Sequence, residues 1–297
     1  MKNIRTLCRA LALVALLAPA LAATSAAAVS YLWEVTSLTN RAYLFGTVHA
    51  GKADWYPLPR AVEDAFADSP VLVVEADVTD VAAMGRSSRA MKYAWPANLA
   101  TNVPADEYAR FRRLIARYSI PEEQAIQLKP FMAVSLLVFG EWSRLGFTPN
   151  FGVDLYLITK AKAGKKAIVE IEGVDAQIRL MESLTNEENL MLFKGTLDAL
   201  ESGLTDEQVK GMVRAWQAGD PAGILDVARR YNEKVPGARE FERKFIWARH
   251  GAMIDKIEGY LNQSTERHFI AVGALHLAGP DGLVEMLRRK GYIVRQL

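Results

Sequence analysis

The sequence contains almost no cysteine. The one cysteine among 297 residues is Cys8, near the start of the chain. If the first segment is removed, the remaining chain has neither a disulfide nor a thiol nucleophile. Disulfide stabilisation and cysteine catalysis are therefore excluded for the mature protein.

Long apolar runs are missing beyond the N-terminus. Residues 1–22 combine a basic start, "MKNIRTLCRA", with a short apolar core, "LALVALLAPALA", that ends on small residues. This pattern predicts a secretory signal peptide cleaved after Ala22 or Ala23. No later run approaches the roughly 20 apolar residues of a transmembrane helix. We therefore expect a periplasmic or secreted protein without a membrane span after signal cleavage.

The chain also lacks an excess of charge. It has 36 Lys and Arg residues against 34 Asp and Glu residues, and loss of Lys2, Arg5 and Arg9 leaves a net charge of about −1. Such a balance gives no electrostatic case for nucleic acid as a partner. Residues 23–297 contain no Pro/Ser-rich linker and no internal repeat, which favours a single domain.

Six apolar runs have the composition of β-strands. They begin at Tyr31, Ala42, Val71, Ala167, His268 and Tyr292, and helical patterns separate several of them. Helices alternating with buried strands predict an α/β fold with a central, mostly parallel or mixed β-sheet and crossover helices. The segment from about 175 to 261 is helical almost throughout, which predicts a helical cap region. Trp95, Trp142, Trp216 and Trp247 are expected to pack in the interior.

Two of the predicted strands end in the same pattern. "YLFGTVHAG" places Gly46 three residues before His49, and "FIAVGALHLAG" places Gly273 three residues before His276. Ligands of open α/β sheets gather at the carboxyl ends of the strands. We therefore expect the two histidines to lie at one edge of the sheet, on neighbouring strands.

A carboxylate is expected in the same place. Glu75 follows the apolar run "VLVV", and "AIVEIEG" adds Glu172 after another strand. Two imidazoles and a carboxylate form a plausible ligand set for a divalent transition metal, which would activate a bound water. A histidine at a strand end is also common as a hydrogen-bonded structural residue, and the spacing leaves both interpretations open.

Four stretches together resemble the TraB/GumN family, in the same order along the chain. They are "YLFGTVHAGKADWYPLP", "VLVVEAD", "GVDLYLITKAKAGKKAIVEIEGVDAQ" and "FIAVGALHLAGPDGLVEMLRRKGYIV". The family resembles the TIKI-type metalloproteases and, more remotely, the erythromycin-esterase and ChaN-like haem-uptake proteins. The resemblance implies a metal-dependent hydrolase, with manganese or cobalt favoured and zinc not ruled out.

The resemblance also implies roles for particular residues. The metal ligands would be His49, His276 and Glu75, and the catalytic residues would be Glu75, Glu172 and Arg243. Three further matches are Gly152 with Asp154, Gln177 after Glu172, and Glu242 before Arg243. Lys244 stands where the family has Asn, which puts the role of that position in doubt.

Three functions remain open at this point. The first is a metal-dependent hydrolase, a peptidase among others, acting on a peptide or small-molecule substrate. The second is a non-catalytic envelope protein that binds a metal or haem, and the third is a family member whose site has decayed. A homodimer is compatible with each of them. His250 and His268 receive no chemical role, and His268 is expected to be exposed.

Overall fold

The computed structural model describes residues 29–297, so the predicted signal peptide lies outside the described residues. All six predicted strands form, and they join one mixed sheet in the order β4-β3-β5-β2-β1-β6. Their bounds are β1 Leu32–Thr36, β2 Arg41–Thr47, β3 Val71–Val74, β4 Ala167–Glu170, β5 His268–Gly273 and β6 Ile293–Gln296. The predicted α/β fold with a mixed sheet is confirmed.

The middle of the sheet is parallel and the far edge is antiparallel. Strands β4, β3, β5 and β2 run in the same direction, whereas β1 pairs antiparallel with both β2 and β6. Residues of β2, β3 and β5 are buried almost without exception. Strands covered on both faces have nearly continuous apolar sequences, which is why these runs were recognisable.

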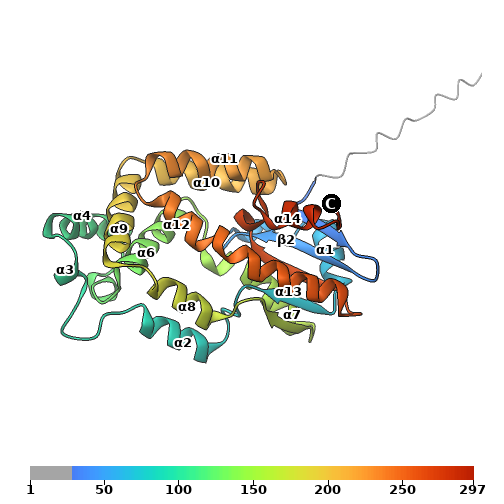
Figure 1. Cartoon of the computed structure of the whole chain (residues 1–297). Helices are drawn as coiled ribbons and strands as arrows, with labels where there is room; N and C mark the ends of the chain where they lie inside the picture. Colours follow the sequence, from blue (N-terminus) through green and yellow to red (C-terminus); the bar gives the residue numbers. More distant parts are fainter. Residues whose placement is uncertain (1–28) are drawn as a thin grey trace, which may run out of the picture.

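Four helices cover the sheet and share its core. They are α1 (Arg60–Ala67), α7 (Val153–Ala163), α13 (His250–Asn262) and α14 (Leu283–Arg289). Each places an apolar stripe on the strands, such as Met253, Ile254 and Ile257 of α13. Figure 1 shows these helices gathered around β2 on one side of the molecule.

The other side of the molecule is a helical lobe with a core of its own (Figure 1). Its helices are α3 Leu99–Asn102, α4 Ala105–Arg117, α5 Glu122–Ala125, α6 Pro130–Arg144, α9 Asn186–Glu201, α10 Leu204–Gln217, α11 Pro221–Lys234 and α12 Ala238–Phe245. Two more, α2 (Val81–Ala90) and α8 (Val174–Glu182), run alongside the lobe. The chain is helical from Val174 to Asn262, as predicted, but α3 to α6 also belong to the lobe. Phe111 of α4, Leu137 of α6 and Phe193 of α9 pack in one core, so this part of the lobe depends on contacts between distant segments.

Two predictions about individual side chains were wrong. His268 is 5% exposed, because its ring stacks on Tyr260 with 4.5 Å between the ring centroids. Trp95 is 87% exposed, because it lies in the loop between α2 and α3, outside every core. Trp216, by contrast, is buried as expected.

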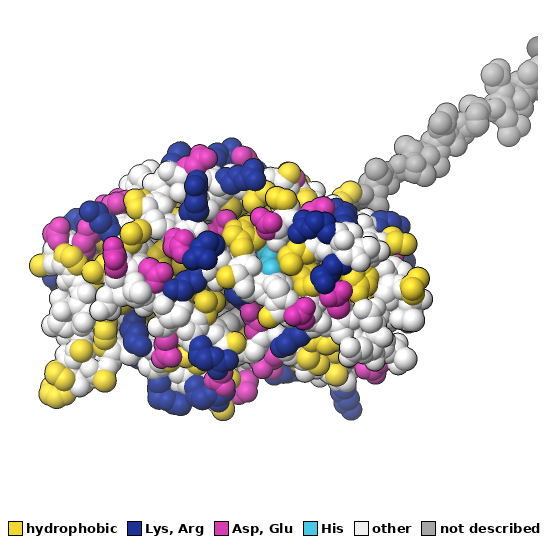
Figure 2. Space-filling view, viewed as in Figure 1, with side chains coloured by type: hydrophobic (Ala, Val, Ile, Leu, Met, Phe, Trp, Pro, Cys, Tyr) yellow, Lys and Arg dark blue, Asp and Glu magenta, His cyan; other side chains and the backbone are white. Residues whose placement is uncertain are grey.

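The surface carries both signs of charge. On the face seen in Figure 2, Lys and Arg side chains alternate with Asp and Glu side chains, and hydrophobic side chains lie between them. Within residues 29–297, no helix combines the length and the apolar character needed to span a bilayer.

Candidate functional site

The two G-x-x-H motifs end neighbouring strands. In the parallel pairing of β2 with β5, Thr47 lies opposite Gly273, and β3 flanks β5 on the other side. The prediction that the motifs are neighbours is confirmed. Because the strands are parallel, their carboxyl ends meet at one edge, where His49, Glu75 and His276 line a cavity of about 330 Å³. We call it the site cavity.

The glycine of the first motif is needed for packing. A Cβ on Gly46 would lie 2.3 Å from a ring carbon of Tyr31, which is closer than any side chain tolerates. The Gly46 carbonyl accepts a hydrogen bond of 2.7 Å from the indole N–H of Trp216 on α10. Glycine therefore lets the end of β2 lie between the sheet core and the helical lobe.

His49 is held by a carboxylate. Its Nδ1 lies 2.8 Å from Oδ2 of Asp154, in the first turn of α7, while Thr47 donates to the other oxygen of Asp154. A carboxylate only accepts hydrogen bonds, so Nδ1 carries a proton and Nε2 is the nitrogen available to a ligand. The charge of Asp154 raises the pKa of His49 to about 9, and the imidazole is therefore protonated at neutral pH.

Two carboxylates, Glu75 and Glu172, bind one arginine that lines the site cavity. Arg249 donates from Nη2 to Glu75 at 2.5 Å, and from Nε and Nη2 to the two oxygens of Glu172. The three side chains are only 13–15% exposed. Burial disfavours the charged form of Glu75, but the positive charge around it prevails and lowers its pKa to about 2.

The remaining hydrogens of Arg249 are also engaged. Nη1 donates to the carbonyl oxygen of Phe245 at 2.7 Å and lies 3.2 Å from Nε2 of His276. Since a guanidinium has five N–H donors, all of them have partners here. The arginine thus connects Glu75, Glu172 and His276.

His276 belongs to a chain of hydrogen bonds that ends on the backbone. His250 donates from Nδ1 to the Asp281 carbonyl oxygen at 2.7 Å, and its Nε2 lies 2.9 Å from Nδ1 of His276. A carbonyl only accepts, so His250 must accept from His276, which leaves the lone pair of His276 on Nε2, the atom that Arg249 contacts. Burial lowers the pKa of His276 to about 3, which keeps the ring neutral.

The glycine of the second motif binds a carboxylate. The N–H of Gly273 donates to Oε1 of Glu75 at 2.7 Å, while Oε2 of Glu75 accepts from Arg249. The second motif therefore contributes His276 to the cavity and fixes the carboxylate beside it. Nε2 of His276 lies 3.7 Å from Oε1 of Glu75.

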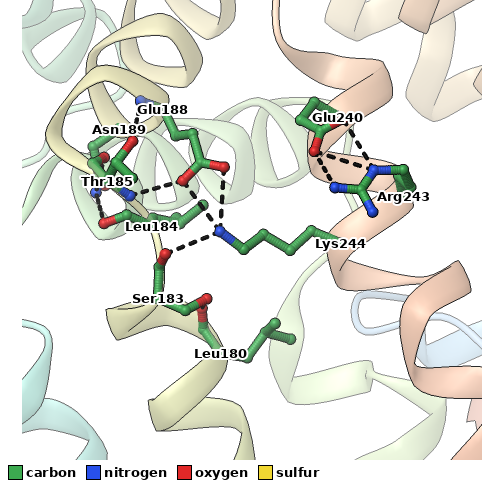
Figure 3. A network of polar contacts seen from close by, with 9 residues as sticks. All are labelled: Leu180, Ser183, Leu184, Thr185, Glu188, Asn189, Glu240, Arg243 and Lys244. Carbon is green, nitrogen blue, oxygen red and sulfur yellow. Dashed lines mark hydrogen bonds and ion pairs between the residues drawn. The ribbon is translucent and has the colours of Figure 1, made fainter.

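Arg243 is not brought to this cavity. It lies on α12 and pairs with Glu240, with 63% of its side chain exposed (Figure 3). The arginine that lines the cavity is Arg249, the next arginine along the chain. The role predicted for Arg243 stays a prediction without structural support, and the same role fits the position of Arg249.

Lys244 also points elsewhere. Figure 3 shows its ammonium group directed at the start of α9, where it donates to the carbonyl oxygen of Ser183 and pairs with Glu188 at 3.1 Å. This Lys fixes α12 to the segment between α8 and α9. Its presence in place of the family's Asn therefore says nothing about decay of the site.

The sequence interpretation also missed His250. A signal was present: "ARHGAM" places Arg249 and His250 side by side just before an apolar helical stripe. The direction of these side chains could not be predicted from the sequence. Trp247–Arg249 form a short 3-10 turn before α13 begins, and this turn changes the direction in which the side chains point.

The donor groups fit a divalent transition metal in chemistry. Both motif histidines have Nδ1 hydrogen-bonded to a fixed partner, the arrangement that orients metal-binding imidazoles and sets their tautomer. Within residues 29–297, however, no three His, Cys, Asp or Glu side chains converge as a ready metal-binding group. The contact of Arg249 with Nε2 of His276 would have to be exchanged for the metal.

Comparison with known proteins gives one consistent family. The model of the TraB/PrgY/gumN family matches residues 31–296. The uncharacterized protein YbaP of Escherichia coli (strain K12) is 25% identical over 270 residues, which cover 87% of this chain and 93% of that protein. Metalloprotease TIKI1 of Danio rerio is 23% identical over 310 residues, and that of Homo sapiens is 22% identical over 311. These matches cover 89% of this chain but only 62% and 61% of the two relatives. No solved structure gives a significant match.

Proposed function

We propose that this chain, which belongs to the TraB/PrgY/gumN family, is a metal-dependent hydrolase of peptide bonds. The relatives named as metalloproteases support hydrolysis of peptides, although the match spans only about three fifths of their length. The proposed metal ligands are His49, His276 and Glu75. Manganese or cobalt is the proposed metal, and zinc is the alternative.

One observation supports this proposal most strongly. Two histidines more than two hundred residues apart line the same cavity with a carboxylate, and each has Nδ1 hydrogen-bonded to a fixed partner. Structural histidines need no such arrangement on both sides of one cavity. Metal-binding histidines do, because the second hydrogen bond sets the tautomer and the ring orientation.

The metal and the side chains of this protein would have different parts in the proposed hydrolysis. A bound divalent ion would act as a Lewis acid and lower the pKa of a water molecule toward neutrality. Hydrolysis then adds the hydroxyl of water to the carbonyl carbon and a proton to the departing nitrogen. Glu75, which is ionised at neutral pH, is the proposed acceptor of the proton from water.

Arg249 is the proposed stabiliser of negative charge on the substrate oxygen. Its guanidinium lines the cavity, and Glu172 fixes its orientation through two hydrogen bonds. Binding of a cation by His276 would release the Nη1–H of Arg249 that now contacts its Nε2. A donor would then face the cavity where charge develops during attack on a carbonyl.

Export is part of the proposal. The basic start, the apolar core and the small residues before Ala22 support cleavage of a signal peptide and a periplasmic or secreted location. Mass spectrometry of the protein from the periplasmic fraction tests this directly. A chain there that still begins at Met1 would contradict it.

A non-catalytic metal- or haem-binding protein is the second candidate. It is favoured by the complete engagement of Arg249, which leaves none of its N–H donors free for a substrate. The two candidate functions differ in whether the metal-loaded protein hydrolyses a substrate. Protein loaded with Mn²⁺ or Co²⁺ should hydrolyse members of a peptide library, and both a chelator and Glu75→Gln should abolish this. Tight metal binding without any hydrolysis would favour the second candidate.

A further inference from the structure

A second cavity opens into the helical lobe. It has a volume of about 340 Å³ and lies among α6, α9, α10, α11 and α12. Apolar side chains that are only half buried make up much of its wall, among them Phe131, Leu192, Met212 and Phe241. We call it the apolar groove. Its volume and that of the site cavity are both within the range of about 300–1,000 Å³ typical of ligand pockets.

The apolar groove adjoins the site cavity. Both are lined by Val138, Phe139, Met212, Ile246 and Leu275. A molecule whose reacting bond lies at Glu75 and Arg249 can therefore extend past these five side chains into the helical lobe. Phe139, at the junction, is 37% exposed although it is a large apolar residue.

Charge is concentrated in the site cavity. The site cavity contains Glu75 and Arg249, together with the two motif histidines. In the wall of the apolar groove Glu242 is the charged side chain, and its two oxygens accept hydrogen bonds from Asn232 at 2.7 Å and Trp247 at 2.8 Å. A charged group of a ligand would gain little in the groove, whereas an apolar side chain would leave water there.

We propose that the apolar groove selects the substrate, which is an extended peptide with a large apolar side chain, such as Leu, Phe or Met, beside the bond that is cleaved. This inference rests on the proposed peptide hydrolysis and adds the substrate class. Thr196, Gln208 and Tyr231 are spaced along the groove wall. Such polar groups suit the amides of a peptide backbone and would be left unpaired beside a plain hydrocarbon chain.

The test obstructs the groove at a distance from the reactive groups. Ser135 lies on α6, is half buried, and bonds only to the Phe131 carbonyl of its own helix at 2.8 Å. Ser135→Phe would place a ring in the groove, and Gln208→Phe would do so from α10. Ser143→Phe is the matched control, since Ser143 lies on the same helix and is exposed.

Hydrolysis of capped fluorogenic peptides that differ only beside the cleaved bond gives the first readout. For the parent, kcat/KM should be at least about tenfold higher with Leu or Phe than with Gly or Asp, as an apolar pocket discriminates. Ser135→Phe and Gln208→Phe should lose this preference through a higher KM for the Leu peptide, with the Gly peptide unaffected. Ser143→Phe should behave as the parent. Equal kcat/KM for Leu and Asp peptides, or a preference that survives both obstructions, overturns the inference.

Binding to the metal-free protein gives a second readout that needs no turnover. A fluorescently labelled Leu peptide should bind the parent and Ser143→Phe, and bind Ser135→Phe at least about tenfold more weakly. If this holds while no peptide is hydrolysed, the groove assignment stands and the hydrolase proposal fails. If labelled palmitate binds the groove and the peptide does not, the peptide assignment is overturned.

Discussion

The two motif histidines, which both line the site cavity, differ in protonation state at neutral pH. Asp154 raises the pKa of His49 to about 9, whereas burial lowers the pKa of His276 to about 3. At neutral pH the first imidazole is therefore charged and the second is neutral. A cation that binds both must displace a proton from His49 only.

Metal affinity should consequently depend on pH. Neutral His49 becomes more abundant as the pH rises toward its pKa of about 9, so affinity should increase by up to about tenfold per pH unit and then level off. Asp154→Asn removes the charge that raises this pKa, and its affinity should be nearly constant above pH 7. Calorimetric titration with Mn²⁺ across this range measures the effect. An affinity of the parent that does not change with pH would contradict the assignment of His49 as a ligand.

His250 is expected to matter although it does not line the cavity. It accepts the hydrogen bond from Nδ1 of His276, so His250→Ala leaves that group without its partner. Loss of such a partner commonly weakens metal binding by about 10- to 100-fold. This revises the expectation from sequence that His250 has no chemical role.

The control for this prediction is another buried histidine. His268 donates to the backbone carbonyl of Glu266 and stacks on Tyr260, at the opposite end of β5. His268→Ala should therefore bind Mn²⁺ as the parent does, even if it is less stable. Equal affinities of the two variants would show that His250 has no part in positioning His276.

At the scale of elements, α10 and β2 are joined by one side chain. Trp216 of α10 donates to the carbonyl of Gly46, three residues before His49. Trp216→Phe keeps most of the ring volume and leaves this buried carbonyl unpaired, so the free energy of unfolding should fall by about 1–3 kcal/mol. Trp95→Phe, at an exposed loop position, should change it by less than about 0.5 kcal/mol. Urea unfolding of both variants measures these changes. An equal loss in the free energy of unfolding for the two variants would show that the hydrogen bond from Trp216 adds no particular stability.

The end of β2 also depends on a residue without a side chain. Gly46→Ala would drive a Cβ into the ring of Tyr31, and overpacking of this kind costs about 1–3 kcal/mol. Gly259 lies inside α13, where an added Cβ would meet nothing within 4 Å, so Gly259→Ala should raise stability by about 0.5–1 kcal/mol. Thermal unfolding should thus move in opposite directions for the two substitutions. A lower unfolding temperature for both variants would indicate that the space around Gly259 on α13 cannot accept a methyl group.

At the scale of the whole molecule, the sheet was predictable and the helical lobe was less so. The strands were recognisable because burial on both faces leaves apolar runs, and the meeting of the G-x-x-H motifs follows from two parallel neighbours. The lobe depends on contacts between α4, α6 and α9, whose sequence separation gives no local signal. Trp95 shows the same limit, since hydrophobic character alone does not place a loop residue inside.

Those residues of the candidate site that directly follow strands were predictable from the sequence. His49, Glu75 and His276 follow strands and were found, because the sheet fixes where such residues lie. Arg249 and His250 follow a break between α12 and α13, at Ile246 and a short 3-10 turn. Helical periodicity cannot be carried across that break, so the sequence could not decide between Arg243 and Arg249.

We propose that His49, His276 and Glu75 bind one divalent metal ion. The most direct test of this proposal is calorimetric titration of the metal-free protein with Mn²⁺ and Co²⁺, beside His49→Ala, His276→Ala and Glu75→Gln. We expect one ion per chain for the parent and loss of most of the affinity in each variant, while His268→Ala should bind like the parent. Binding by His49→Ala and His276→Ala that equals binding by the parent would contradict it, and the repeated motif would then serve the architecture of the sheet alone.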